Sequence, residues 1–540
     1  MKLGKASRVN VNLRFGLILS VLVVLFLFLS DEKKEGESAV SMTDYCYVPP
    51  TTGIEVKPNV LFVVDFSGSM QFPVHVGCIF RGYDKQKVAQ CETINETYRP
   101  EFTYQGYFDP DKCYKPTNKG FEETPCQTQD RIGTNNAISG NLLNWVTTTR
   151  IDVARKVLTG GKSPQATATP TVLISEGAEY TVVDTNLGCN FEINANQPDS
   201  RKLSISNIPG KSCRFDLNNV DIKLNLPSGT PVKGVIHDFC DTSNINGQLN
   251  EKCKVIMQFM VFSSDERYGE IRVGKNATIA ELFSAINNET PYWGTPTGEA
   301  LWEAYDYYRQ INAYPYEANT AYIQRANPGK DPYYDKIGNQ EMAVWCRKGF
   351  VLLITDGAWN GDVDPIIPAH KMATTDLRED LEGVQSVNTY VVYAWGDRDT
   401  QQRLEGRRAT IATAIFGGFE DLDNDKWPFP FFSYNPNSIG NCQYTSGGDS
   451  TRRSDIKVKR PNGSEYTYCN SRGVLNPLDF CNPGGTWDPK CAEWDTVSGS
   501  FKDGLPYNFF EADDEESLRN AILSALYDIL RRASSAAAVA

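Results

Sequence analysis

Continuous apolar runs alternate along the chain with segments of helical periodicity. The runs are rich in Val, Ile, Phe and Tyr and lack alternation, which is typical of strands covered on both faces. They lie at Val60–Asp65, Val255–Phe262, Phe350–Thr355 and Thr389–Ala394. The helical segments are Leu142–Leu158, Ile279–Asn287, Thr297–Ile311, Arg403–Phe416 and Glu515–Arg531. This order predicts an α/β fold, a doubly wound and mostly parallel sheet with helices on both faces.

The last helical segment has the clearest amphipathic pattern. Its apolar side chains recur at helical spacing and form one stripe: Leu518, Ala521, Ile522, Ala525, Leu526, Ile529 and Leu530. Asp513 and Asp514 precede it, and carboxylates at that place cap the first turn and suit the helix dipole. A helix that packs on the predicted sheet is expected here.

Long cysteine-bearing segments separate these elements, at about 71–139, 175–254, 312–347 and 420–510. Loops of such length without structure are uncommon in compact domains. The second segment has short alternating runs, Tyr180–Val183 and Asp221–Leu224, which indicate strands. We therefore expect one domain over residues 58–532 with disulfide-rich, partly β insertions, followed by a low-complexity tail at 533–540.

The N-terminus has the pattern of a targeting segment. Basic residues precede the apolar stretch Phe15–Leu29, and charged residues follow it at once. The stretch is short for a membrane span and fits the core of a signal peptide. It lacks a clear small-residue cleavage site, so an uncleaved membrane anchor remains the alternative. Both readings predict export, with residues 1–30 as signal or anchor and 31–57 as linker.

Fourteen cysteines, an even number, are consistent with export and predict disulfides. Zinc binding is disfavoured because no C-x-x-C pair exists and only three histidines are present. Two sequence-local pairs are expected, Cys189–Cys213 and Cys240–Cys253, and the remaining connectivity stays open. The net charge of −13 and pI near 5.0 exclude nucleic acid as the expected partner, since phosphate binding needs a basic footprint.

Oxygen-bearing side chains follow two of the predicted strands. Asp65, Ser67 and Ser69 end the first run as D-x-S-x-S, and Asp356 ends the run at Phe350–Thr355. Thr295 stands between them in a G-T-P-T-G loop that leads into a helix. Open α/β sheets bind ligands at the carboxyl ends of their strands, and hard oxygens suit Mg²⁺, with Mn²⁺ or Ca²⁺ as alternatives. The alternative is a purely structural role, in which these residues only cap helices and turns.

Together, and in this order, the three pieces resemble a von Willebrand factor A domain with its metal-ion-dependent adhesion site. In such a site the cation keeps an open coordination position for a carboxylate of a partner. The hydroxyls of Ser67, Ser69 and Thr295 and the carboxylates of Asp65 and Asp356 are the expected ligand set.

A second acidic loop, Asp421, Asp423 and Asp425, alternates carboxylates as a calcium loop does. It departs from the EF-hand pattern, because Lys426 stands at the turn glycine and Phe432 at the bidentate glutamate. A solvated acidic turn is the alternative reading. Catalytic motifs such as G-x-S-x-G and H-E-x-x-H are missing from the sequence, and histidines are scarce, so an enzyme is not expected.

A further group of segments forms a recognisable pattern: Asn141–Trp145, Arg150–Asp152 and Arg155–Gly161. Supporting segments are Tyr107–Pro110 with Cys113 and Tyr114, Cys346, Gly417–Phe419 and Asp503–Pro506. Together they resemble the PilY family, the exported type IV pilus biogenesis factors and tip adhesins.

The resemblance implies a role in pilus biogenesis, tip adhesion and surface attachment, in the periplasm or at the outer surface and pilus tip. The implied partners are minor pilins or surface ligands, and contact with the membrane is expected only through an uncleaved N-terminal segment. Family members usually continue into a calcium-binding β-propeller. We expect that propeller to be absent, encoded separately or outside the given sequence, so its functions are not transferred to this chain. The alternative is a metal-dependent, non-enzymatic binding subunit of another exported complex.

Overall fold

The computed structural model describes residues 56–165, 169–195, 201–262, 269–310, 330–337, 340–357, 359–360, 364–396, 400–428, 432–433, 457–459, 465–467, 489–495 and 503–537. The predicted signal or anchor segment lies outside the described residues, as does most of the 420–510 insertion. Within the described part of the chain, no helix has the length and apolar character needed to cross a bilayer.

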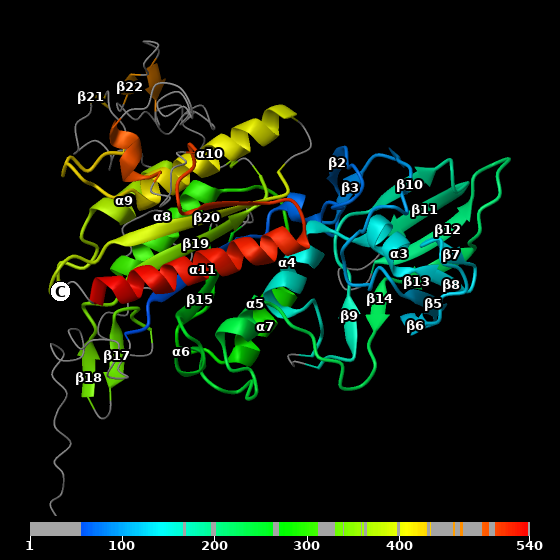
Figure 1. Cartoon of the computed structure of the whole chain (residues 1–540), viewed down its shortest axis with the longest axis horizontal. Helices are drawn as coiled ribbons and strands as arrows, with labels where there is room; N and C mark the ends of the chain where they lie inside the picture. The colour runs from blue at the N-terminus through cyan, green and yellow to red at the C-terminus, as the bar shows by residue number, and fades with distance from the viewer. Residues whose placement is uncertain are drawn as a thin grey trace, which may run out of the picture.

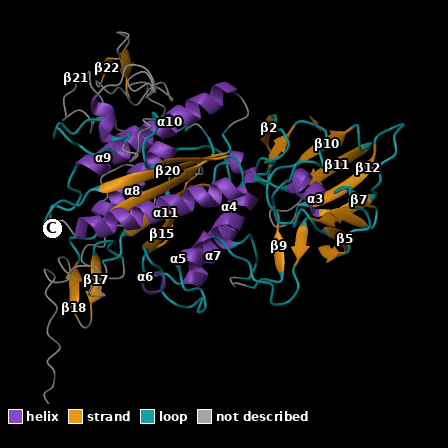
Figure 2. Cartoon of the chain, in the orientation of Figure 1, coloured by secondary structure: helices purple, strands orange, loops and turns teal. Residues whose placement is uncertain are grey.

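A six-stranded sheet forms the centre of the larger part of the molecule (Figures 1 and 2). In spatial order its strands are β16 (Glu270–Val273), β15 (Ile256–Phe262), β1 (Asn59–Asp65), β19 (Gly349–Thr355), β20 (Val387–Ala394) and β24 (Phe509–Ala512). All neighbours are parallel except β16, which runs antiparallel to β15 at one edge. All four predicted strands are present in this sheet. The two edge strands, β16 and β24, were not predicted.

Helices pack against both faces of this sheet. One face meets α8 (Thr297–Arg309), α9 (Ile366–Thr374) and α10 (Thr400–Gly418). The other meets α4 (Arg150–Thr159), α5 (Val235–Phe239), α7 (Ile279–Asn288) and α11 (Glu515–Ala537). Successive side chains of β1 alternate between the two cores, with Leu61 in the first and Phe62 in the second. The predicted mixed α/β class is therefore confirmed.

The segment Leu142–Leu158, predicted as one helix, consists of two. α3 (Gly140–Thr147) and α4 are separated by two threonines in extended conformation. The Thr149 side chain accepts a hydrogen bond from the Asp152 amide and so caps α4, as threonine does at helix starts. The apolar periodicity of the segment concealed this break. At the other end of the chain, Asp514 accepts from the Ser517 amide at the start of α11, as the sequence predicted.

The first two insertions combine into a β-rich unit beside the main sheet, on the right in Figure 1. One of its sheets has the order β13-β12-β11-β10-β4 and the other β7-β8-β5-β6-β14-β9. Helix α3 packs into the same core through Leu142, Leu143 and Trp145. The strands are β4 (Ile94–Asn95), β5 (Cys113–Thr117), β6 (Gly120–Thr124), β7 (Gly133–Thr134), β8 (Ala137–Ser139), β9 (Val172–Ile174), β10 (Tyr180–Asp184), β11 (Cys189–Asn194), β12 (Lys202–Asn207), β13 (Leu217–Asp221) and β14 (Lys223–Asn225).

Smaller elements complete the described chain. A hairpin of β2 (Phe80–Tyr83) and β3 (Ala89–Cys91) lies between the main sheet and the β-rich unit (Figure 1). The others are α6 (Leu249–Lys252), the hairpin β17 (Tyr334–Ile337) and β18 (Gln340–Ala343), and the small sheet of β21 (Phe432–Ser433), β22 (Lys457–Lys459) and β23 (Glu465–Thr467).

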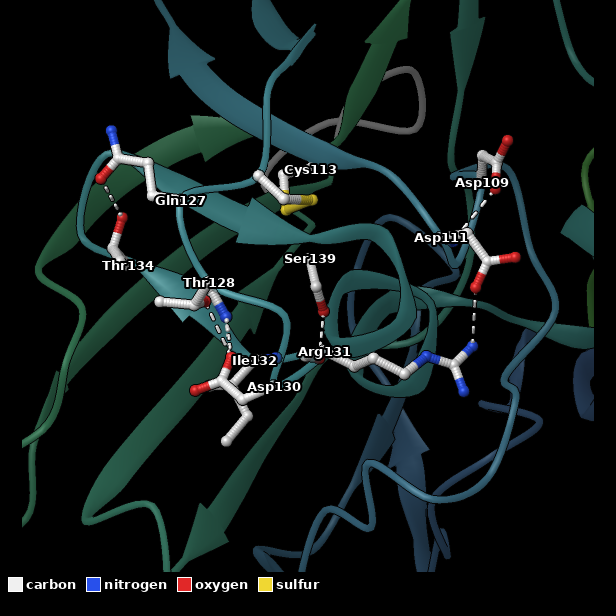
Figure 3. The surroundings of a disulfide bond; sticks show 12 residues. Asp109, Asp111, Cys113, Gln127, Thr128, Asp130, Arg131, Ile132, Thr134 and Ser139 are labelled. Atoms are coloured by element: carbon white, nitrogen blue, oxygen red, sulfur yellow. Dashed lines mark hydrogen bonds and ion pairs between the residues drawn. A yellow bond between two sulfur atoms is a disulfide. The ribbon is translucent and has the colours of Figure 1, made fainter.

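Four disulfides join cysteines that are near in sequence. They are Cys78–Cys91, Cys113–Cys126, Cys189–Cys213 and Cys240–Cys253. Both predicted pairs are confirmed, and the described residues contain no free cysteine. Around Cys113 the loop is further held by Asp130, whose carboxylate accepts from the Thr128 hydroxyl and the Ile132 amide (Figure 3). Polar turns and disulfides together order the insertion.

His370 of α9 is expected to make the protein sensitive to acid. Burial lowers its pKa from 6.5 to about 4, against the hydrogen bond from its Nε2 to the Lys426 carbonyl oxygen, which raises it. The unfolded chain binds the proton near pH 6.5 and the folded chain only near pH 4. Stability therefore falls by about 3 kcal/mol as the pH drops through that window. Urea unfolding at several pH values measures this, and His370→Gln should flatten the dependence. An equal slope in both proteins contradicts the assignment.

Candidate metal-binding site

The two carboxylates predicted to hold a cation lie at the ends of neighbouring strands. Asp65 is the last residue of β1, and Asp356 directly follows β19. These strands are parallel and in register, with Val64 opposite Ile354. Both aspartates have no exposed surface. The chain leaves β1 toward β15 and returns to β19 on the opposite side, so the site lies where the strand order reverses.

Hydrogen bonds connect these aspartates to the two serines of the D-x-S-x-S loop. The Ser69 hydroxyl donates to Asp356 Oδ1 at 2.7 Å, and the Ser67 and Ser69 hydroxyl oxygens are 3.0 Å apart. Asp65 Oδ1 accepts from the Ser67 amide at 2.7 Å. The structure thus brings together four of the five residues expected from the sequence, and hydrogen bonds link them into one cluster.

Thr295 belongs to a loop that lies against this cluster. The Gly68 amide donates to the Trp293 carbonyl oxygen at 2.6 Å, which ties the two loops together. Thr295 is buried, and Asn360 holds it in place by a pair of hydrogen bonds to its backbone amide and carbonyl. Within the described chain, Thr295 forms these hydrogen bonds through its backbone. Its place in a ligand set therefore stays a prediction.

Arg150 is a member of the site that the sequence reasoning did not include. Its guanidinium donates to Asp356 Oδ2 at 2.7 Å, and both side chains are almost completely buried. The residue starts α4 directly after the Thr149 cap, where a cation is disfavoured by the helix dipole. A buried arginine at such a position requires a carboxylate partner elsewhere in the chain. The sequence reasoning placed Arg150 within one continuous helix, so this conflict was not visible before the structure was known.

A second addition is Thr355, whose hydroxyl donates to Asp65 Oδ2 at 2.6 Å. Burial and, after it, the charge of Asp356 raise the pKa of Asp65 to about 7, against the hydrogen bonds from Ser67 and Thr355, which lower it. Two buried carboxylates lie here, and the Arg150 guanidinium pairs with one of them. An oxygen-lined cluster with these carboxylates fits a hard divalent cation.

Tyr83 of the β2–β3 hairpin covers the D-x-S-x-S loop. A Cβ atom on Gly68 would lie 1.6 Å from the Tyr83 hydroxyl, so a larger residue at position 68 would displace the Tyr83 ring. The Tyr83 ring stacks on Trp293 with centroids 6.1 Å apart. Burial and the charge of Asp356 raise the pKa of Tyr83 to about 12, which keeps the hydroxyl protonated. The first insertion therefore forms one wall of the candidate site.

The second acidic loop has a different character. Asp421, Asp423 and Glu493 are close enough to share a metal ion, and Asp425 is not part of that group. Lys490 already lies among these carboxylates, with Nζ 2.7 Å from Asp423 and 2.7 Å from Asp425. Because this ammonium already compensates part of the negative charge, the cluster is accounted for as an acidic turn neutralised by lysine. Calcium binding there stays a prediction.

Comparisons with known proteins bear on the β-rich unit. Residues 95–224 match the family model described as "PilY1 homolog, small alpha/beta domain". Two curated proteins of Xylella fastidiosa (strain Temecula1 / ATCC 700964), both named "Type IV pilus biogenesis factor PilY1 homolog", are similar to this chain. One is 32% identical over 139 residues, 22% of this chain, and the other 36% identical over 89 residues, 16% of this chain. No solved structure matches.

The matched domain contains most of the strands of the β-rich unit together with α3 and α4, and so it includes Arg150. Residues 95–224 are therefore similar to a small α/β domain of PilY1 homologs, and these findings support the PilY1-type resemblance that the sequence predicted. The matches cover only 11% and 6% of the length of the two curated relatives. The disulfides and the family fit an exported protein.

Proposed function

We propose that this protein is an exported type IV pilus-associated factor that binds a partner through a divalent cation, without catalysis. The proposed domain is a doubly wound, von Willebrand factor A-like sheet, and the proposed ligands are Asp65, Ser67, Ser69, Thr295 and Asp356. The observation that carries the proposal is the hydrogen-bonded cluster of Asp65, Ser67, Ser69 and Asp356 at the ends of two adjacent parallel strands.

The arrangement of the sheet supports this reading. Its strand order places the first strand in the middle and an antiparallel strand at one edge, and helices cover both faces. The names of the two relatives, both pilus biogenesis factors, support the pilus context. Minor pilins or a surface ligand are the proposed partners, and the periplasm, outer surface or pilus tip is the proposed location.

The charges at the site favour a partner that brings a carboxylate. Two ionised aspartates are balanced by one Mg²⁺, and Arg150 adds one further positive charge close to Asp356. The occupied site would therefore carry an excess of positive charge in buried surroundings, where charge interactions are strong. A carboxylate that completes the octahedron of the ion neutralises this excess.

Magnesium is expected to stabilise the folded protein, and Asp65→Ala should abolish the effect. A ligand that binds only the native state stabilises it by about 2.7 kcal/mol at a hundredfold excess over Kd. Thermal unfolding with Mg²⁺ and with EDTA measures the difference, and Mn²⁺ and Ca²⁺ identify the preferred ion.

Asp423→Ala is the matched control, because it removes a carboxylate from the other acidic cluster. It should leave the magnesium effect intact. Equal melting temperatures of the wild-type protein in Mg²⁺ and EDTA contradict the metal site. A magnesium effect that is lost in Asp423→Ala but kept in Asp65→Ala assigns the ion to the second acidic loop instead.

A further inference from the structure

A groove separates the start of α11 from the first insertion. It consists of two cavities of about 720 and 700 Å³. The cavities share four lining residues, Val74, Asn95, Glu96 and Asp513, so they form one continuous depression. Two joined cavities suit an extended polypeptide better than a compact small molecule. The groove is separate from the proposed metal ligands, although Arg150 lines one end.

Part of the groove lining is apolar and open to solvent. Ile79 and Phe80 line the first cavity with 67% and 44% of their surfaces exposed, and Phe102 lines the second with 51% exposed. Phe72 packs against Phe80 with ring centroids 5.6 Å apart, which extends this surface inward. Large apolar side chains gathered in a concave surface with polar margins are typical of protein interaction sites.

The polar side of the groove is acidic. Four carboxylates line it: Glu92, Glu96, Asp513 and Asp514. Two arginines also line it: Arg150, whose guanidinium is paired with Asp356, and Arg99. Carboxylates therefore outnumber arginines along the groove by four to two. An acidic groove attracts a basic partner and repels an acidic one.

We propose that this groove is a docking site for an extended segment of a partner protein that combines basic and apolar side chains. Successive side chains of an extended chain point to opposite sides. Apolar residues of the segment can then contact Ile79, Phe80 and Phe102, while lysines or arginines face the carboxylates. This chemistry is distinct from that of the proposed metal site, which takes a carboxylate, so the two surfaces select opposite charges.

Three synthetic peptides test the proposal with the full, disulfide-bonded chain by fluorescence anisotropy. The first alternates lysine and phenylalanine, the second glutamate and phenylalanine, and the third lysine and glycine. The first should bind at least about tenfold more tightly than the others, and its affinity should fall as salt rises. Binding should persist in EDTA and in Asp65→Ala, which separates this site from the metal site.

A triple variant, Glu92→Gln, Glu96→Gln and Asp513→Asn, should weaken binding of the lysine–phenylalanine peptide about tenfold. Glutamine at position 96 keeps an acceptor for the Gly77 amide that Glu96 binds at 3.0 Å. The matched control, Glu192→Gln, Asp216→Asn and Glu251→Gln, changes the net charge equally at exposed positions outside the groove. It should bind like the wild type.

Ile79→Ser tests the apolar part of the lining, and it is expected to weaken binding of the lysine–phenylalanine peptide. The melting temperature should not change, because Ile79 is exposed. The proposal is overturned if the glutamate–phenylalanine peptide binds equally well. It is also overturned if the two triple variants behave alike, since attraction by overall charge would then account for binding.

Discussion

Arg150→Ala is expected to destabilise the metal-free protein by about 3–5 kcal/mol. The substitution leaves Asp356 as a buried carboxylate without its cation, and loss of one partner of a buried ion pair typically has an effect of that size. Asp65 lies at the end of the adjacent strand and is also buried, so repulsion between the two carboxylates adds to the cost. Urea unfolding in EDTA measures the change.

The same substitution should cost much less when Mg²⁺ is present. A divalent cation bound between Asp65 and Asp356 compensates the charge that Arg150 no longer supplies, so the variant should also bind Mg²⁺ at least as tightly as the wild type. Arg407→Ala is the control. It removes an ion pair with Glu511 in which each side chain is about one-third exposed, and it should cost less than about 1 kcal/mol.

Two outcomes would count against this account. A loss below about 1 kcal/mol in EDTA would mean that the Arg150–Asp356 pair is not a strong buried contact. An equal loss in EDTA and in Mg²⁺ would mean that no cation shares the charge of Asp356.

The sequence predicted the main sheet well because its strands carry their own signal. A strand buried on both faces must be continuously apolar, and β1, β15, β19 and β20 all show such runs. The site followed from the same reasoning, since side chains after adjacent parallel strands meet at one edge. Asp65 and Asp356, 291 positions apart in number, could therefore be paired before the structure was known.

The missed features depend on contacts between distant segments. Arg150 was placed inside one predicted helix, so its conflict with the dipole of α4 was not visible. Its partner is 206 residues away, and periodicity contains no information about contacts over that distance. Tyr83 reaches Gly68 because the Cys78–Cys91 hairpin folds back over the metal loop. Edge strands β16 and β24 are short and only partly buried, so their patterns are weak. The break between α3 and α4 was hidden by apolar residues that face two different cores.

The larger consequence of these contacts is that the candidate site is built by both parts of the chain. The main sheet supplies Asp65 and Asp356. Helix α4, which lies within the matched PilY1 homolog domain, supplies Arg150, and the first insertion supplies Tyr83. A change in either part therefore alters the charge or the access of the proposed cation.

In cells that carry type IV pili, Asp65→Ala is expected to abolish attachment while leaving the protein folded and exported. Deletion of the gene should reduce surface pili or attachment, and wild-type protein should restore them. Asp65 supplies one of the two carboxylates of the site, so the variant should lose the cation. A partner carboxylate would then face Asp356 and Arg150 alone, and most of the attraction would be lost.

The fold should survive because Asp65 ends β1 and is not part of either apolar core. Circular dichroism and the abundance of exported protein test this directly. Asp423→Ala, in the second acidic cluster, should restore attachment fully and controls for the loss of one acidic residue. Minor pilins should be captured with the wild-type protein in Mg²⁺ and lost in EDTA or with Asp65→Ala.

Normal attachment in the deletion strain, in the absence of a second homologue, contradicts the pilus assignment. Full restoration by Asp65→Ala retains that assignment but places partner binding elsewhere on the molecule, since the attachment surface would then work without its cation.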